Sequence, residues 1–417
     1  MAGGKVLLLG LGMQGRVALH DLLASRDIAQ VTVVDNPQVL KERLPKSDKV
    51  RGVTLDASDR DGLAALMGQS DVVIELLPGW LSLPTAQLAA EVGVSSVSTM
   101  YYTNPGEEDP AKVAARREEL RALDEKAKQK GITQLCEFGM DPGIDLALSL
   151  QAVRELDEVH EFYSYGAGFP ERAACNNPLN YKFSWSIEGL FRSYYRPARI
   201  LKDGAVVDIA AAAQFAPTNM HYLDIPEIGG RLESFPNGDA IKYIDELGIG
   251  KTVRSMARYT NRWPGHGAFW EVAAKCGFLT EVPVKVQAKT GAGAGGAGGA
   301  GEVTVTPLDF ITALMGSQKQ FHYADGERDV ALIRIDARGK KGGRPARVIY
   351  QIIDYRDLAT GFTAMSRTVG FPASIGAHMI LDGTIKQRGL IYPTDVPFEP
   401  YMDELKKRGI KVEHVVE

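Results

Sequence analysis

The chain has 417 residues, 45% of them hydrophobic and 24% charged, and its formal net charge is −4. This length predicts two or three domains with substantial cores. The slightly acidic charge argues against a nucleic-acid-binding surface, which needs a basic excess. There is no run of about eighteen consecutive apolar residues, so we expect no membrane span.

The cysteine content and the first residues both favour the cytoplasm. Cys136, Cys175 and Cys276 are too few and too scattered for a disulfide framework, and they fit reduced thiols. The first residues lead almost directly into an apolar run and lack the layout of a signal peptide.

The most informative segment lies near the start of the chain. The apolar run Val6–Leu9 leads into the pattern Gly10-x-Gly12-x-x-Gly15, a helical pattern follows, and a second apolar run ends at Asp35. In a dinucleotide-binding unit the first glycine permits the turn, the second admits a pyrophosphate, and the third lets helix and strand pack closely. The alternative is a glycine-rich turn of a doubly wound fold that binds nothing.

The acidic residue at the end of the second run bears on the choice of cofactor. The carboxylate of Asp35 can accept hydrogen bonds from the ribose hydroxyls and would repel a 2′-phosphate, which favours NAD over NADP.

Apolar runs alternate with helical patterns up to about residue 145, as a parallel sheet requires. Strands are predicted over 71–77, 95–102 and 133–138, and helices over 85–92, 111–130 and 145–156. Leu77 and Pro78 begin a loop of the kind that contacts the cofactor in such folds. The predicted cofactor-binding residues are Gly10, Gly12, Met13, Gln14, Gly15, Asp35, Leu77 and Pro78.

The composition changes after residue 145. Residues 159–209 and 330–354 are rich in aromatic and β-branched residues, which predicts longer strands of a mixed or antiparallel sheet. The Gly/Ala tract at 291–301 predicts a flexible surface connector, because it lacks the side chains of a core. A helix is expected over 364–382 with an interruption at Gly370–Pro372, and a charged helix over 402–409.

Several segments resemble the saccharopine dehydrogenase family. The turn Gly139-Met-Asp-Pro-Gly-Ile-Asp145 is similar to that family's Gly-Leu-Asp-Pro-Gly-Ile-Asp segment. Asn177-Pro-Leu-Asn-Tyr-Lys-Phe-Ser-Trp-Ser186 resembles the Asn-Pro-Leu-Gly-Tyr-Lys-Phe-Ser-Trp-Ser pattern of the glutamate-forming saccharopine reductases. Gly230–Glu233, Arg262–His266 and Gly361–Pro372 match as well.

The resemblance implies an α/β fold in three parts. These are an N-terminal Rossmann domain over 1–145, an inserted substrate-binding and dimerisation domain on a mixed sheet over 146–362, and a C-terminal segment over 363–417 that packs back on the Rossmann domain. It also implies a homodimer with a nicotinamide cofactor and a small amino-acid substrate. We expect NAD, because Asp35 departs from the fungal NADP enzymes, with NADP as the alternative.

The implied activity is oxidation of the CH–NH group of a lysine-derived amine. Saccharopine, cleaved to glutamate and 2-aminoadipate semialdehyde, is the foremost substrate. The alternatives are an NAD-dependent L-lysine 6-dehydrogenase, a carboxynorspermidine-type reductase and a non-catalytic dinucleotide-binding protein.

Such a reaction needs a group that takes or holds the proton of the amine. Asp141 follows a parallel strand, where ligands bind in doubly wound sheets, although an Asp-Pro-Gly turn explains it equally well. Lys182, in a segment predicted to be a strand, points either to solvent or into a pocket, and the family motif favours the pocket. His266 is either an acid–base group or a satisfied structural residue.

The substrate carboxylates need cationic and polar partners. Arg231 and Arg262 are predicted carboxylate clamps, with an ordinary ion pair as the alternative for each. Tyr101 and Tyr102 end a Rossmann strand and are predicted to contact nicotinamide or substrate, although core packing explains one of them equally well. Ser184, which lies inside the matching segment Asn177–Ser186, is predicted as a further substrate-binding residue. The histidines lack metal-ligand spacing, so no metal is predicted.

Overall fold

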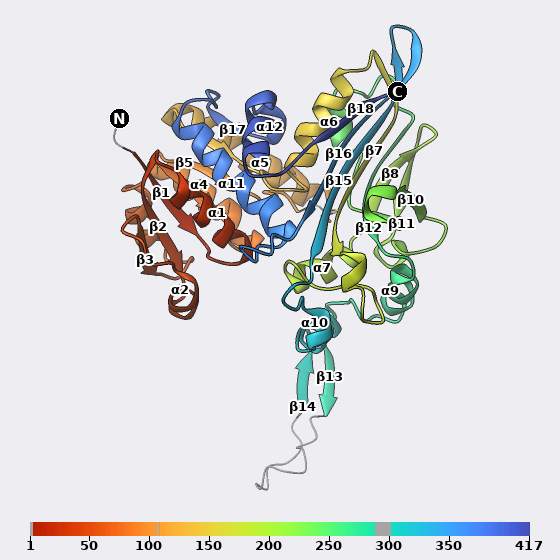
Figure 1. Cartoon of the computed structure of the whole chain (residues 1–417), viewed down its shortest axis with the longest axis horizontal. Helices are drawn as coiled ribbons and strands as arrows, with labels where there is room; N and C mark the ends of the chain where they lie inside the picture. The colour runs from red at the N-terminus through yellow and green to blue at the C-terminus, as the bar shows by residue number, and fades with distance from the viewer. Residues whose placement is uncertain (1–2, 105, 108, 288–301) are drawn as a thin grey trace, which may run out of the picture.

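The computed structural model describes residues 3–104, 106–107, 109–287 and 302–417. Within them lie a seven-stranded sheet, a nine-stranded sheet and a separate two-stranded hairpin (Figure 1). The α/β fold with a Rossmann-type sheet and a second, mixed sheet is therefore confirmed. The Gly/Ala tract at 291–301 lies outside the described residues.

The first sheet is entirely parallel, in the order β17-β6-β5-β4-β1-β2-β3. Its strands are β1 (Gly4–Leu9), β2 (Ile28–Asp35), β3 (Val50–Thr54), β4 (Val72–Glu75), β5 (Ser95–Ser98), β6 (Thr133–Leu135) and β17 (Gly389–Ile391). The predicted strands over 95–102 and 133–138 both end earlier than expected, at Ser98 and Leu135. Their last residues instead form loops at the carboxyl edge of the sheet.

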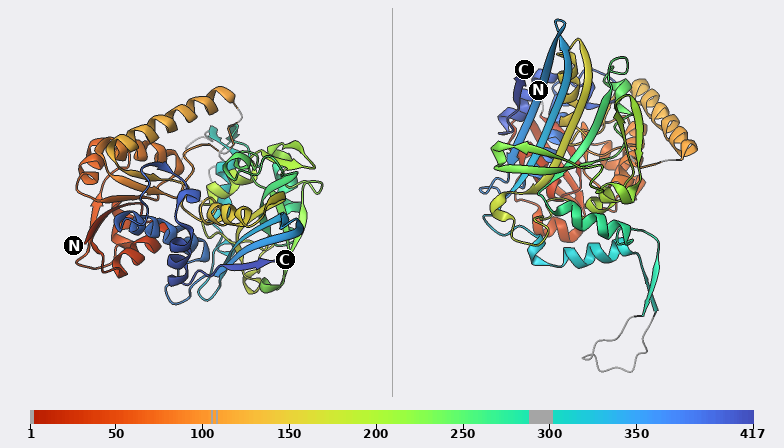
Figure 2. Two further views of the ribbon diagram at one scale, coloured as in Figure 1. Left: turned by 90° about the horizontal axis from the view of Figure 1, so that it is seen from above. Right: turned by 90° about the vertical axis from the view of Figure 1, so that its right-hand side faces the viewer.

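Helices cover both faces of this sheet. They are α1 (Met13–Ala24), α2 (Pro37–Arg43), α3 (Arg60–Met67), α4 (Ser82–Val92), α5 (Pro110–Lys130), α11 (Ala364–Leu381) and α12 (Phe398–Lys407). Val6 and Leu8 pack in the core with α1 and α11, whereas Leu7 and Leu9 pack with α3 and α4. This alternation is what a strand buried on both faces requires. Figure 2 shows α5, in orange, lying along the outside of the first domain.

The second sheet follows the order β10-β11-β12-β7-β15-β16-β18, with β8 attached to β12 and β9 to β8. Its strands are β7 (Glu158–Pro170), β8 (Ala198–Lys202), β9 (Ala205–Ile209), β10 (His221–Ile225), β11 (Gly230–Pro236), β12 (Ser255–Arg262), β15 (Asp329–Lys341), β16 (Arg344–Tyr355) and β18 (Glu413–Val416). Only the β7–β12 pair is parallel among these described strands.

Two cores hold the mixed sheet. The helix α6 (Ile144–Arg154) packs against it, and this core is continuous with that of the parallel sheet. A second core, rich in aromatic residues, lies among α7 (Ile187–Tyr194), α9 (His266–Lys275) and α10 (Pro307–Gly316). The short α8 (Tyr243–Glu246) joins the first core through Tyr243.

The hairpin of β13 (Val284–Gln287) and β14 (Glu302–Val305) projects away from the body of the molecule (Figure 1). Its register places four valines on one face: Val284, Val286, Val303 and Val305. Three of them are 44–46% exposed, so this apolar face has little cover within the described chain.

The helix α11 runs without interruption through Pro372, which corrects the predicted break at Gly370–Pro372. Gly370 lies so close to α1 that a Cβ there would stand 2.5 Å from the carbonyl oxygen of Gln14. Packing of this closeness holds the helix in place although proline removes one of its hydrogen bonds.

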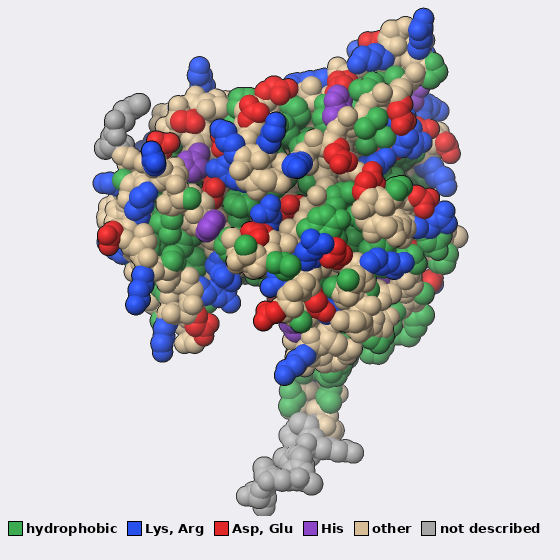
Figure 3. Space-filling model, viewed as in Figure 1, with side chains coloured by type: hydrophobic (Ala, Val, Ile, Leu, Met, Phe, Trp, Pro, Cys, Tyr) green, Lys and Arg blue, Asp and Glu red, His purple; other side chains and the backbone are tan. Residues whose placement is uncertain are grey.

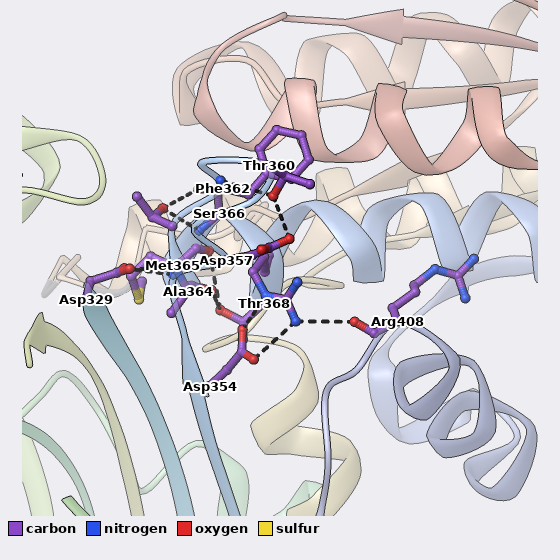
Figure 4. A network of polar contacts seen from close by, with 12 residues as sticks. Asp329, Asp354, Asp357, Thr360, Phe362, Ala364, Met365, Ser366, Thr368 and Arg408 are labelled. Atoms are coloured by element: carbon purple, nitrogen blue, oxygen red, sulfur yellow. Dashed lines mark hydrogen bonds and ion pairs between the residues drawn. The ribbon is translucent and has the colours of Figure 1, made fainter. Parts of the chain in front are cut away.

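The start of α11 is fixed by acidic side chains of the mixed sheet (Figure 4). The carboxylate of Asp329 accepts hydrogen bonds from the backbone N–H groups of Ala364 and Met365, at 2.7 and 3.1 Å. Arg367 donates to Asp354 at 2.7 Å. The C-terminal segment then gives β17 to the parallel sheet and β18 to the mixed sheet, a strand that the sequence did not lead us to expect.

The surface carries charges of both signs. Figure 3 shows Lys and Arg side chains interspersed with Asp and Glu over the face that it presents. In the part of the chain that the structure describes, no helix is long and apolar enough to span a membrane.

Candidate active site

The glycine turn has the geometry that a bound dinucleotide requires. Gly10 has φ 95°, and a Cβ on it would stand 2.6 Å from the carbonyl oxygen of Leu76. A Cβ on Gly15 would stand 2.0 Å from the carbonyl oxygen of Gly10, whereas a Cβ on Gly12 would meet no atom within 4 Å. The first and third glycines are therefore needed for packing, and the second faces open space that a pyrophosphate can fill.

The N-terminus of α1 points its backbone N–H groups at the same space. The helix begins at Met13 with Gly12 as its N-cap, and no side chain caps it. Uncapped N–H groups and the positive end of the helix dipole suit a phosphate. Gly12, Met13 and Gln14 therefore lie where their backbone N–H groups could hold the pyrophosphate of a dinucleotide.

Asp35 lies directly beside this turn. Its Oδ2 accepts a hydrogen bond from the N–H of Leu11 at 2.6 Å, and its Oδ1 accepts one from the N–H of Asn36 at 2.7 Å. Arg43, at the end of α2, donates to the carbonyl oxygen of Leu11 at 3.3 Å. One carboxylate and one guanidinium therefore flank the place where the glycine turn would receive a ribose.

A buried acid that the sequence did not single out ties the next loop to the sheet. Glu75 ends β4 and is 1% exposed. Its carboxylate accepts hydrogen bonds from the N–H of Leu77 at 2.7 Å and from Ser98 Oγ at 2.6 Å. Burial raises the pKa of Glu75 to about 6. Glu75 thus fixes the loop that carries the predicted cofactor residues Leu77 and Pro78.

The centre of the site is Arg258, on β12, which lies between two aspartates. Its Nη2 contacts Asp141 Oδ1 and donates to Asp145 Oδ2 at 2.8 Å. Its Nη1 donates to the hydroxyl oxygens of Tyr243 at 2.8 Å and Tyr101 at 3.3 Å. The structure therefore brings together the predicted residues Asp141 and Tyr101 around an arginine that the sequence analysis missed.

The two aspartates differ in their surroundings. The side chain of Asp145 is 1% exposed, and that of Asp141 is 14% exposed. Burial, assisted by the charge of Asp141, raises the pKa of Asp145 to about 8. Asp145 therefore keeps its proton at neutral pH, because a buried carboxyl group beside another carboxylate resists ionisation.

A second set of charged groups adjoins Tyr101. The ammonium of Lys242 lies 4.8 Å from the centre of the Tyr101 ring and 4.6 Å from that of Tyr243. Glu137, two residues after β6, has φ 57°, and burial raises its pKa to about 7 although Lys242 opposes the shift. Burial raises the pKa of Tyr101 to about 12, so its hydroxyl stays neutral.

Arg262 lies on the same face of β12 as Arg258, because residues four apart on a strand share a face. It is buried and donates to Tyr194 Oη at 2.7 Å and to the carbonyl oxygen of Asn261 at 2.7 Å. Its guanidinium also lies 4.9 Å from the centre of the Tyr181 ring. No carboxylate of the described residues forms an ion pair with it.

Glycines on the neighbouring strand β7 leave room over this face. A Cβ on Gly166 would stand 2.2 Å from Asp141 Oδ2, and one on Gly168 would stand 2.4 Å from Met365 Sδ. Asp141 therefore reaches over the mixed sheet beside the row that contains Arg258 and Arg262.

His266 does not have the surroundings of an acid–base group. Its Nε2 pairs with Tyr194 Oη at 2.9 Å, and its Nδ1 lies 3.2 Å from the carbonyl oxygen of Leu179. Burial and the charge of Arg262 lower the pKa of His266 to about 3. The ring is therefore neutral and fully engaged, which corrects the catalytic prediction.

Lys182 lies in an irregular segment, not in the predicted strand. Its side chain is 3% exposed, so it points inward as the family motif favours, and its ammonium donates to Glu327 Oε2 at 2.5 Å, which balances its charge within the chain. Ser184, from the same segment, is buried, and its hydroxyl has no hydrogen-bond partner among the described residues.

Two further predicted substrate contacts lie elsewhere. Arg231 is 57% exposed on β11, where it pairs with Asp224 at 2.9 Å. Tyr102 is buried in a small core with Leu83 and Cys136. Arg231 therefore forms a surface ion pair and Tyr102 packs in a core, which are the alternative interpretations given for these two residues.

A glycine turn fitted to a dinucleotide shares its sheet edge with a buried acid–arginine cluster, and this combination defines a dehydrogenase of the nicotinamide-dependent class. The chain belongs to the saccharopine dehydrogenase family. The model described as the saccharopine dehydrogenase NADP binding domain matches residues 6–135, and that of the saccharopine dehydrogenase C-terminal domain matches residues 139–410.

Individual relatives agree with this assignment. The chain is 28% identical to a saccharopine dehydrogenase (NADP(+), L-glutamate-forming) of Pyricularia oryzae, with 100% of each chain covered. It is also 28% identical to the mitochondrial alpha-aminoadipic semialdehyde synthase of Bos taurus, where it spans 47% of the synthase. The apo saccharopine dehydrogenase (L-Glu forming) of Saccharomyces cerevisiae has a similar structure, with a TM-score of 0.79, 25% identity, and 99% and 100% of the two chains covered.

Proposed function

We propose that the chain is a glutamate-forming saccharopine dehydrogenase. It would oxidise the secondary amine of saccharopine and release L-glutamate and 2-aminoadipate semialdehyde. The observation that carries the proposal is the Asp141–Arg258–Asp145 cluster, because it places proton-holding groups at the sheet edge that also carries the glycine turn. The names of relatives that align over their whole length support the same substrate.

The roles of the chain's groups follow from this geometry. When bound, a nicotinamide ring accepts the hydride from the carbon next to the substrate nitrogen. Asp141 accepts the proton of the amine, and Arg258 holds its carboxylate in place. Asp141, which is 14% exposed, then releases this proton to solvent, takes a proton from the water that adds to the resulting imine, and returns that proton to the departing glutamate nitrogen. Asp145 keeps its own proton near neutral pH, and Arg258 donates to the Tyr101 hydroxyl and so orients it.

Binding of the substrate needs cations, because saccharopine carries three carboxylates. Arg262 is buried without an ion-pair partner among the described residues, which leaves its charge to be balanced by a ligand. We assign it a substrate carboxylate, and a guanidinium suits this role because it donates two parallel hydrogen bonds.

For the cofactor we propose NAD. The matching relatives carry NADP(+) in their names, whereas Asp35 places a negative charge beside the glycine turn where a 2′-phosphate would lie. Arg43 is the group that would attract such a phosphate if NADP binds instead.

We also propose a homodimer that acts in the cytoplasm. The half-exposed valine face of the β13–β14 hairpin supports association, and the three free cysteines suit a reducing compartment. Light scattering on the purified chain would test the dimer, and a monomeric mass would contradict it.

A steady-state assay with saccharopine, lysine and both cofactors tests the proposed function. We expect reduction of the cofactor with saccharopine and the appearance of glutamate. Reduction with lysine alone would instead identify an L-lysine 6-dehydrogenase, and cofactor binding without turnover on either amine would identify a non-catalytic protein.

A further inference from the structure

Arg196 is a second arginine of the site that lacks a balancing charge. It follows α7, and its Nη2 donates to Asn237 Oδ1. Its Nε is closed to solvent and has no hydrogen-bond partner among the described residues. No carboxylate within the described ranges forms an ion pair with it. A buried donor without an acceptor destabilises the fold, so a ligand that accepts from it would remove an unfavourable interaction.

The surroundings of Arg196 place it at the candidate active site. Asn237, its hydrogen-bond partner, donates through its backbone N–H to the carbonyl oxygen of Arg258 at 2.8 Å. The electrostatic neighbours of Arg196 include Tyr101, Asp141 and Arg258. Burial lowers the pKa of Arg196, and the positive charge of Arg258 lowers it further.

The acids of the site do not supply the missing charge. Asp141 and Asp145 both pair with Arg258, and Asp145 keeps its proton up to about pH 8. Both carboxyl groups are therefore directed at Arg258, and neither forms an ion pair with Arg196. Arg196 therefore has no ion-pair partner among the described residues.

Two glycines let the chain pack closely around the side chain of Arg196. A Cβ on Gly106 would stand 3.3 Å from its Cγ, and a Cβ on Gly238 would stand 3.7 Å from its Nε. Gly106 belongs to the loop between β5 and α5, and Gly238 to the loop after β11. The guanidinium is thus held between a loop of the parallel sheet and a loop of the mixed sheet.

The two unbalanced arginines adjoin different positions along β12. Arg196 adjoins Asn237, whose backbone N–H donates to the carbonyl oxygen of Arg258. Arg262 lies four residues beyond Arg258 on β12, so the backbone positions of Arg258 and Arg262 are roughly 13 Å apart at strand spacing. Asp141 reaches over Gly166, between these positions. An extended substrate with its amine at Asp141 would therefore present one acidic end to each arginine.

We propose that Arg196 binds a carboxylate of the glutamate half of the substrate and so selects a substituted amine over lysine itself. The inference rests on the proposed function, since it takes the substrate amine to lie at Asp141. Arg262 would then bind the carboxylate of the lysine-derived half. Lysine, which has only the second of these carboxylates, leaves Arg196 unpaired.

The reverse reaction separates the two halves and gives the test. In Arg196→Met, which keeps the apolar length of the side chain but removes its charge, we expect the KM for L-glutamate to rise at least about tenfold, the factor that one charged hydrogen bond provides. The KM for 2-aminoadipate semialdehyde and the affinity for the cofactor should change less than about twofold, within ordinary surface-substitution effects. Arg196→Lys should restore part of the glutamate affinity.

Arg199→Met is the matched control, because Arg199 lies three residues further on, is exposed and pairs with Asp208 and Asp239. It should leave every KM unchanged. An unchanged KM for glutamate in an active Arg196→Met protein would overturn the inference, and so would an equal rise in both substrate KM values. If the unmodified protein turns over neither saccharopine nor glutamate with the semialdehyde, it is the proposed function that fails.

Discussion

The choice of cofactor can be tested at Asp35 with a change that removes charge and keeps shape. In Asp35→Asn the side-chain oxygen can still accept the hydrogen bond that Leu11 N–H now donates at 2.6 Å. The turn therefore keeps its anchor, and the main change is the loss of one negative charge beside the ribose. Asp35→Ala removes both the charge and the anchor.

The size of the effect follows from Coulomb's law. A carboxylate and a doubly charged phosphate about 5 Å apart repel by about 1.7 kcal/mol even at the dielectric constant of water, which is about 15-fold in affinity. Replacing a charged acceptor of the ribose hydroxyls by a neutral amide costs NAD about 1 kcal/mol more, or about fivefold. The preference for NAD over NADP should therefore decrease by a factor of between about ten and about one hundred.

The assay is the ratio of kcat/KM for the two cofactors at fixed saccharopine and fixed ionic strength. Asp35→Asn should shift the ratio toward NADP, while Asp35→Ala should also weaken NAD binding because Leu11 loses its acceptor. A ratio that stays unchanged in Asp35→Asn would refute the role of this carboxylate, and so would a preference of the unmodified chain for NADP.

Two further predictions concern buried acids. Burial raises the pKa of Glu75 from 4.5 to about 6, so its contribution to the free energy of unfolding is complete below about pH 4.5 and is lost as the pH rises through 6. Relative to the unmodified chain, Glu75→Gln should therefore gain up to about 2 kcal/mol in free energy of unfolding at pH 8 and nothing at pH 4. Equal melting-temperature shifts at both pH values would contradict this. Because burial raises the pKa of Asp145 to about 8, the profile of kcat against pH should change slope near pH 8 and lose that feature in Asp145→Asn; a feature that persists in the variant belongs to another group.

The glycine turn and the parallel sheet were predictable because local geometry dictates them. Gly10 needs a positive φ, and Gly15 has no space for a Cβ, so the sequence pattern and the packing demand the same residues. The positions of Asp141 and Tyr101 were also predictable, since each follows a parallel strand at the edge where ligands bind, and their roles stay predictions.

Arg258 and Arg196 escaped the sequence analysis for a different reason. Their roles depend on partners far away in the sequence, which no local pattern reveals: Arg258 and Asp141 are 117 residues apart, and Arg196 and Asn237 are 41 residues apart. The pattern that was available is the alternation along β12, which puts Arg258 on the same face as Arg262. Lys182 shows the converse error, because its apolar neighbours suggested a strand, whereas it lies in a loop and pairs with Glu327.

The helix break expected at Pro372 failed because tertiary packing overrode local propensity. The close contact between Gly370 and α1 stabilises α11 across the proline. His266 likewise had the residue type of an acid–base group but not the environment, which is closed and next to a cation. Packing and burial, which the sequence does not report directly, determined both the continuity of α11 and the environment of His266.

The proposed function requires oxidation of one particular carbon of saccharopine, and product analysis identifies that carbon. Saccharopine can be cleaved on either side of its secondary amine, so the purified chain should be incubated with saccharopine and each cofactor and the products identified by mass spectrometry. We predict L-glutamate and 2-aminoadipate semialdehyde in equal amounts with the reduced cofactor, and a strong loss of rate in Asp141→Asn. Release of lysine and 2-oxoglutarate, or no turnover of saccharopine, would contradict the account.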